Sequence, residues 1–302
     1  MGMSSAFTSH PESLKSCSYQ FKGLSLKYKN TIHLITDGTI KYDGGSFFGQ
    51  VPKMYWEKHI KSDRFNRVNV GLNCLVVKTE NGNVLIDTGA GTKDRAVMKE
   101  KYGVSRSKLL SGLKEVGLSA KDIDFVLLTQ LQSDHSGGCS KIDRSGQPIP
   151  VFPKAKYIVQ ESAWDYATNP GIRSKYYYNS RDFNCLKDFG QLVFVSGSEE
   201  ILPGIVVKKT DGYCTGHQII QIESGGEKIV LTGDIIPTSL HIDPTCISAY
   251  DQCPEDTFQE KTDLIGRAIK EGFLLIFSHA NNQKAGYLEE RNGSVLLKPV
   301  NL

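Results

Sequence analysis

Four apolar segments of this 302-residue chain end abruptly in side chains that can ionise or bind a metal. The polar residues that follow these segments are Asp87, the pair Asp134 and His135, Asp234 and His279. Buried carboxylates and imidazoles are costly unless they are paired, hydrogen-bonded or bound to a metal. Each position alone could be a turn residue, a helix cap or a core histidine. Taken together, the four positions indicate one metal centre at the ends of strands, where sheet proteins commonly place their chemistry.

The segments before these residues have the length and composition of short buried strands. Two of them, 72–78 and 84–86, are separated by Asn81-Gly82, a strong hairpin signal. Leu109, Leu110, Leu113 and Val116 recur at helical spacing and predict a helix within 105–117. Further helices are predicted near 160–168 and 256–270, and the other predicted strands are 32–35, 125–128, 157–159, 192–195, 205–208, 219–222, 229–232 and 274–277. This pattern suits two packed sheets with helices outside.

In their order and spacing, these motifs resemble the metallo-β-lactamase superfamily, whose pattern is H-x-H-x-D-H, then a distant His, an Asp after Gly, and a late His. The N-terminal region looks like that of the lactonases that degrade acyl-homoserine lactones and of methyl parathion hydrolases. The residues that carry this likeness are Asp37-Gly38, Asp43-Gly44-Gly45, Phe48-Gly49, Val51-Pro52-Lys53, Trp56, Asn73-Cys74-Leu75 and 85–89. The resemblance runs from about residue 32 to 280. It implies an α/β protein with the αββα sandwich of that fold, as a single domain over 26–302 after a flexible segment 1–25.

The first metal site of the family pattern is broken in this chain. Gln130 and Gln132 stand at the H-x-H positions, and a glutamine amide is a poor zinc ligand beside imidazole or thiolate. The string at 212–218 is similar to the family's G-H-T-x-G-H-Q, which places Tyr213 at the third ligand position, 21 residues before Asp234. His217 is the alternative occupant. Gln130, Gln132 and Tyr213 could fill the volume left by the missing first metal, contact the substrate, or do both.

The second site of the pattern is intact. Asp134, His135, Asp234 and His279 can hold one divalent metal ion, and this mixed nitrogen and oxygen set accepts zinc, iron or manganese. Asp87 is expected to orient one of these ligands. The predicted catalytic residues are Asp134, Asp234 as a terminal ligand or general base, and Tyr213 as a donor to a developing oxyanion.

Three functions are compatible with such a site. The first is a metal-dependent hydrolase with a mononuclear site that acts on a lactone or ester-like small molecule. The second is a metalloenzyme with non-hydrolytic chemistry, oxidative or lyase-like, and the third is a non-catalytic ligand-binding pseudoenzyme. The resemblance implies a substrate pocket lined by the segment around Phe48 and Trp56, with the aromatic stretch 166–178 and the nearby Trp164 as a second candidate wall. Either segment could equally be core or a dimer contact. A homodimer is expected by analogy only.

Composition narrows the range of partners. The chain has 36 basic and 33 acidic residues mixed along its length, without the clustered basic face of nucleic-acid-binding proteins. It has no apolar run of the roughly 20 residues that a membrane span needs. The serine-rich residues 1–19 do not form a secretory signal, so a cytoplasmic location is the default expectation. The seven cysteines form no CxxC pair and are expected to be free thiols.

Overall fold

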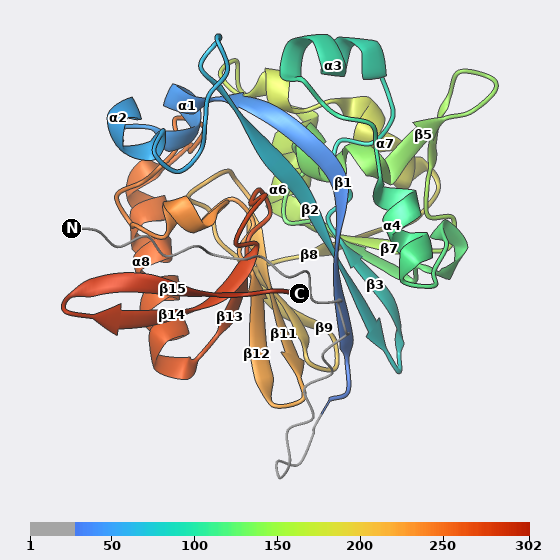
Figure 1. Cartoon of the computed structure of the whole chain (residues 1–302). Coiled ribbons are helices and arrows are strands. Elements are labelled where there is room, and N and C mark those ends of the chain that lie inside the picture. The colour runs from blue at the N-terminus through green and yellow to red at the C-terminus, as the bar shows by residue number, and fades with distance from the viewer. Residues whose placement is uncertain (1–27) are drawn as a thin grey trace, which may run out of the picture.

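The computed structural model describes residues 28–302, and their strands form two large sheets (Figure 1). The first sheet runs in the order β1 (Thr31–Asp43), β2 (Arg67–Thr79), β3 (Gly82–Ile86), β4 (Phe125–Leu127), β7 (Lys156–Gln160) and β8 (Leu192–Val195). The second runs in the order β15 (Ser294–Val300), β14 (Ala285–Arg291), β13 (Leu274–Ile276), β12 (Glu227–Leu231), β11 (Gln218–Ser224), β10 (Ile205–Lys209) and β9 (Ser198–Leu202). A small hairpin pairs β5 (Ser140–Ile142) with β6 (Pro148–Pro150).

Alternation of side chains along the strands explains why the two sheets stack. Leu75 and Val77 of β2 are buried in one core together with Leu231 of β12 and Ile276 of β13. Val76, which lies between the first two, belongs to a different core on the opposite face of its sheet. Because successive strand residues point to opposite faces, both faces of the first sheet are apolar and both must be covered.

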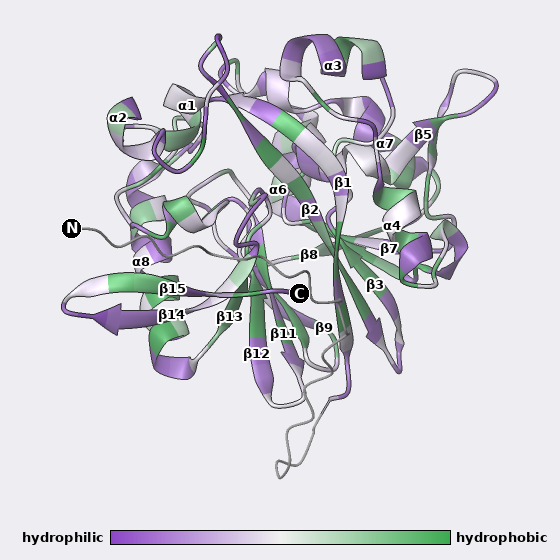
Figure 2. Cartoon of the chain, in the orientation of Figure 1, coloured by the Kyte–Doolittle hydropathy of each residue, from purple (hydrophilic) through white to green (hydrophobic). Residues whose placement is uncertain are grey.

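Helices cover these outer faces, so the layers follow the order helix, sheet, sheet, helix. Residues of α4 (Leu109–Glu115), α6 (Glu161–Thr168) and α7 (Ser180–Asp188) pack against the first sheet. The longest helix, α8 (Pro254–Glu271), buries Leu264, Ile265 and Ala268 against the second sheet. The helix is amphipathic and carries both hydrophobic and hydrophilic residues, as that packing requires (Figure 2). The remaining helices are α1 (Gly44–Phe48), α2 (Lys53–Trp56), α3 (Arg95–Tyr102) and α5 (Ser133–Ser136). The predicted αββα sandwich is thereby confirmed.

Most of the predicted elements coincide with observed ones. The Asn81-Gly82 turn joins β2 to β3 as an antiparallel pair, and the three predicted helices correspond to α4, α6 and α8. The hairpin of β14 and β15 was not predicted, although Asn292-Gly293 at its turn is a signal of the same kind. The flexible segment predicted for residues 1–25 lies outside the described residues, and the single domain over 26–302 stays a prediction.

Two parallel strand pairs position the candidate site. β3 pairs with β4 in the first sheet and β12 pairs with β13 in the second, each in parallel. Because the carboxyl ends of parallel strands meet at the same edge of a sheet, the residues that follow these four strands are brought close together. The six cysteines of the described part are free, and five of them are buried. Within residues 28–302 no helix is both long and apolar enough to cross a membrane.

Candidate metal centre

The four predicted metal ligands converge at the shared edge of the two sheets. Asp134 and His135 lie on the one-turn helix α5, Asp234 follows β12 and His279 follows β13. One ligand atom from each residue lies within 4.8 Å of the others. His279 Nε2 is 3.1 Å from Asp234 Oδ1, and His135 Nε2 is 3.2 Å from Asp234 Oδ2. These four residues are called the ligand cluster below.

Hydrogen bonds on the far side of each imidazole point its other nitrogen into the ligand cluster. His279 Nδ1 donates to the carbonyl of Gly71 at 2.7 Å, and His135 Nδ1 donates to Asp87 Oδ2 at 2.9 Å. Both Nε2 atoms are buried and lie at ion-pair distance from Asp234, but neither makes a well-directed hydrogen bond. Buried polar atoms are almost always satisfied, so two such atoms facing two carboxylates fit a bound divalent cation.

Electrostatics within the ligand cluster also suit a cation. Burial alone would lower the pKa of His135, but Asp234, Asp134 and Asp87 hold it well above its ordinary value. Burial would likewise raise the pKa of Asp234, yet His135 and His279 hold it well below its ordinary value. The surrounding carboxylates thus attract positive charge to this position, and a cation that binds must displace a proton from an imidazole.

His217 lies behind the ligand cluster and does not face it. Its Nε2 accepts a hydrogen bond from the backbone N–H of Asp234 at 3.0 Å, and its Nδ1 donates to Thr210 Oγ1 at 2.6 Å. Burial lowers the pKa of His217 to about 4, which keeps the ring neutral. Gly233 has a φ of 53°, and a Cβ there would lie 2.4 Å from His217 Nε2. His217 therefore supports the loop that carries Asp234.

Gln130, Gln132 and Tyr213 lie in a hydrogen-bonded network beside the ligand cluster, and Gln130 joins this network to Asp234. Gln130 Nε2 donates to Asp234 Oδ2 at 2.6 Å, and Gln130 Oε1 accepts from the thiol of Cys214 at 3.3 Å. The Tyr213 hydroxyl donates to Gln132 Oε1 at 3.3 Å. All these side chains are buried. Hydrogen-bonded neutral side chains thus stand at the positions where the family pattern has the ligands of a first metal.

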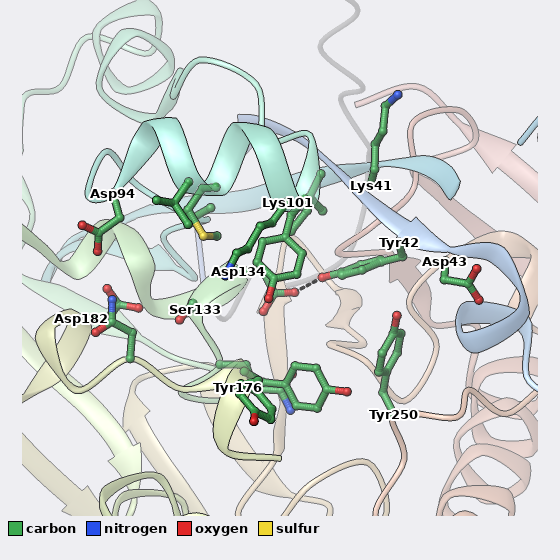
Figure 3. A pocket seen from close by; sticks show the side chains of 18 of the residues that line it. Lys41, Tyr42, Asp43, Asp94, Lys101, Ser133, Asp134, Tyr176, Asp182 and Tyr250 are labelled. Atoms are coloured by element: carbon green, nitrogen blue, oxygen red, sulfur yellow. Dashed lines mark hydrogen bonds between the residues drawn. The ribbon is translucent and has the colours of Figure 1, made fainter. Parts of the chain in front are cut away.

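Tyr42, which the sequence analysis did not single out, reaches the ligand cluster from β1. Its hydroxyl donates a short hydrogen bond to Asp134 (Figure 3). Burial, then Asp134 and Asp234, raise the pKa of Tyr42 well above its ordinary value, so the phenol keeps its proton. Two features of the sequence lie close to Tyr42, but neither identifies its contact with Asp134. Tyr42 directly precedes the Asp43-Gly44-Gly45 motif, and it shares a strand face with Ile40.

A cavity of about 590 Å³ opens over the ligand cluster. Asp134 is the member of the ligand cluster that lines it, beside Gln132 and Tyr213, whereas His135, Asp234 and His279 do not. Phe48 and Trp56, expected in the cavity wall, do not line it and are only 1% and 3% exposed. Their rings stack in the core because short helices α1 and α2 turn their apolar faces inward, with ring centroids 5.0 Å apart. The second candidate stretch does reach the cavity, through Tyr176 and Tyr177.

Comparison with known proteins identifies the family. The family model described as the metallo-beta-lactamase superfamily matches residues 69–272, a range that contains the network and all of the ligand cluster except His279. The chain belongs to the metallo-β-lactamase superfamily. The resemblance expected from the motifs is thereby confirmed. Metallo-β-lactamase superfamily members are generally hydrolases that bind divalent metals such as zinc, and the ligand cluster is this chain's candidate site for such an ion.

Individual relatives agree with this assignment. A probable metal-dependent hydrolase from Staphylococcus aureus superposes with a TM-score of 0.81 at 30% identity, covering 92% of this chain and all of that one. The N-acyl homoserine lactonase of Bacillus thuringiensis is 24% identical over 232 residues, 72% of this chain and 84% of that enzyme. For the lactonase of Bacillus cereus, 24% identical over 178 residues, the match covers 55% of this chain and 64% of the enzyme. The dizinc quorum-quenching lactonase AidC shares the fold at a TM-score of 0.74 and 20% identity, covering 92% of this chain and 98% of that one.

Proposed function

We propose that the protein is a hydrolase that acts on a lactone or another ester-like small molecule with a single divalent cation. One observation carries this proposal. The buried Nε2 atoms of His135 and His279, without well-directed hydrogen bonds, face two carboxylates at one position, whereas Gln130, Gln132 and Tyr213 are satisfied by neighbouring side chains. The first arrangement suits a divalent cation, whereas the second is satisfied by neutral side chains and Asp234.

The ligand cluster would hold zinc, iron or manganese, with Asp87 fixing the tautomer and orientation of His135. A cation there supplies Lewis-acid polarisation of a carbonyl oxygen and lowers the pKa of a water molecule towards about 7. The family membership and the lactonase relatives support a small ester or lactone as the substrate.

The chain's own residues have distinct parts in such a reaction. Asp134, whose side chain is 11% exposed, lines the cavity and is placed to accept a proton from a water molecule on the cavity floor. Asp234 is 3% exposed and has a depressed pKa, so it is a weak base and serves as a ligand. Burial, then Asp234 and Asp134, raise the pKa of Tyr213 well above its ordinary value. The Tyr213 phenol therefore stays protonated and can donate to a developing oxyanion in the cavity.

The test is a hydrolysis screen of aliphatic and aromatic esters and lactones with protein loaded with zinc, iron or manganese. We expect turnover that is lost after chelation and in His279→Ala, and restored in the parent protein when metal is returned. Oxygen consumption recorded in parallel distinguishes oxidative chemistry from hydrolysis. Tight metal binding with no turnover of any ester or lactone would favour a binding protein instead. The homodimer and the cytoplasmic location stay predictions, the first testable by sedimentation.

A further inference from the structure

Tyrosine side chains are the most frequent type in the wall of the cavity above the ligand cluster. Six of them come from five separate parts of the chain and meet around one space. They are Tyr42, Tyr102, Tyr176, Tyr177, Tyr213 and Tyr250. Figure 3 shows Tyr42, Tyr176 and Tyr250 around Asp134. A ligand that reaches the ligand cluster must therefore lie against aromatic rings.

Three of these rings, those of Tyr42, Tyr250 and Tyr177, form a row that leads away from the ligand cluster. The centroid of the His279 ring is 5.6 Å from that of Tyr42, and Tyr42 is 5.6 Å from Tyr250. Tyr250 is in turn 5.6 Å from Tyr177, with the two planes at 85°. All three spacings lie within the range of favourable aromatic pairs. A planar ring bound in the cavity can extend this row with the same edge and face contacts.

The other side chains of the cavity complement an uncharged aromatic ligand. Val97 and Met98 of α3 line the same space, and a methionine thioether contacts aromatic rings favourably. Charges in the wall are balanced, with four basic residues (Lys41, Arg67, Lys93 and Lys101) and four acidic ones (Asp43, Asp94, Asp134 and Asp182). The buried Lys93 is already paired with Asp182 at 3.0 Å. The cavity thus gives no strong preference for a charged substrate.

We propose that this tyrosine-walled cavity selects neutral esters or lactones that carry an aromatic ring next to the scissile carbonyl. The proposal rests on the hydrolase function proposed above and names its substrate class. Aromatic pairs add roughly 0.5–1.5 kcal/mol beyond the apolar area that they bury, which corresponds to a two- to tenfold preference over a saturated ring of similar size. An alkyl chain gains only from the burial of its area.

The test compares two ligands that differ only in the aromaticity of one ring. Phenylacetate and cyclohexylacetate are the acids that matched esters would release, and both place a carboxylate at the cation. Their affinities for the metal-loaded protein are measured by calorimetry. We expect phenylacetate to bind roughly two- to tenfold more tightly. The preference should shrink in Tyr250→Leu and in Tyr177→Leu. It should persist in Tyr287→Leu, because Tyr287 lies on β14 outside the cavity wall.

Equal affinities, tighter binding of cyclohexylacetate, or no binding of either acid at millimolar concentration would overturn the proposal. A preference unchanged in both cavity variants would also overturn it, because the selectivity would then arise elsewhere. The readout is binding and does not require turnover. Tighter binding of phenylacetate by a protein that hydrolyses no ester would refute the proposed function alone and support the aromatic selectivity.

Discussion

Replacing Asp87 by asparagine should weaken metal binding without disturbing the backbone. Asp87 is 1% exposed and accepts hydrogen bonds from His135 Nδ1 at 2.9 Å and from the backbone N–H of Thr129 at 2.8 Å. Its φ is 57°, a left-handed conformation that asparagine tolerates as well as aspartate. Asp87→Asn therefore removes the charge and one acceptor while leaving the turn intact.

The size of the effect follows from these contacts. Loss of a residue that orients a metal-bound histidine typically costs 10- to 100-fold in metal affinity. That range corresponds to about 1.4–2.8 kcal/mol of binding free energy. The free energy of unfolding of the metal-free protein should also fall by about 2 kcal/mol, because charge-assisted bonds to a buried group are lost.

Competition with a chromogenic chelator measures the metal affinity, and urea denaturation measures the stability. Asp143→Asn is the matched control. Asp143 is half-buried and accepts hydrogen bonds from residues of its own turn, so its replacement should leave metal affinity unchanged. Parent-like metal affinity in Asp87→Asn would refute the claim that this carboxylate orients His135 for a cation.

Three further predictions concern the residues around the ligand cluster. The triple variant Gln130→His, Gln132→His, Tyr213→His should bind a second metal ion per chain, because three imidazoles replace neutral groups at the first-site positions. Elemental analysis measures the number of metal ions, and an unchanged number would contradict the assignment of these positions. Tyr42→Phe should lower the free energy of unfolding of the metal-free protein by about 1–3 kcal/mol, because the buried hydroxyl donates to a carboxylate that is only partly exposed, and equal stability in urea would argue against this bond. Metal affinity should increase with pH until the raised pKa of His135 is passed, because below that pKa the cation must displace the imidazole proton. Over the same rise in pH the metal-free fold should lose stability, since a raised folded-state pKa stabilises only below it; a pH-independent affinity would contradict both statements.

The ligand cluster could be predicted because each of its residues belongs to a recognisable local sequence pattern. Each of its members follows a short apolar strand, and the strand order then brings those ends together. Tyr42 lay beyond such reasoning because its partner, Asp134, is 92 residues away and the contact exists only in the folded protein. No local pattern distinguishes a strand residue of this kind from an ordinary core residue.

Phe48 and Trp56 were predicted to line the cavity, but the structure places them in the core. An aromatic segment near a site is compatible with a cavity wall and with a core, since both bury apolar area. The structure stacks Phe48 on Trp56 and on His241, each at 5.0 Å, which places these rings in the core. The hairpin of β14 and β15 escaped prediction because its edge strand is only half apolar, with Leu296 47% exposed. The alternation of apolar and polar residues along β15, from which a strand would be predicted, is therefore weak.

The central claim is that the chain holds one divalent cation through the ligand cluster. Elemental analysis by plasma mass spectrometry of protein purified without added metal tests it most directly. We predict about one equivalent of zinc, iron or manganese per chain, lost in His279→Ala and retained in His59→Ala, whose imidazole is exposed on another part of the chain. Circular dichroism of both variants establishes that they are folded. About two equivalents in the parent protein, or none even after reconstitution, would contradict the single-cation account.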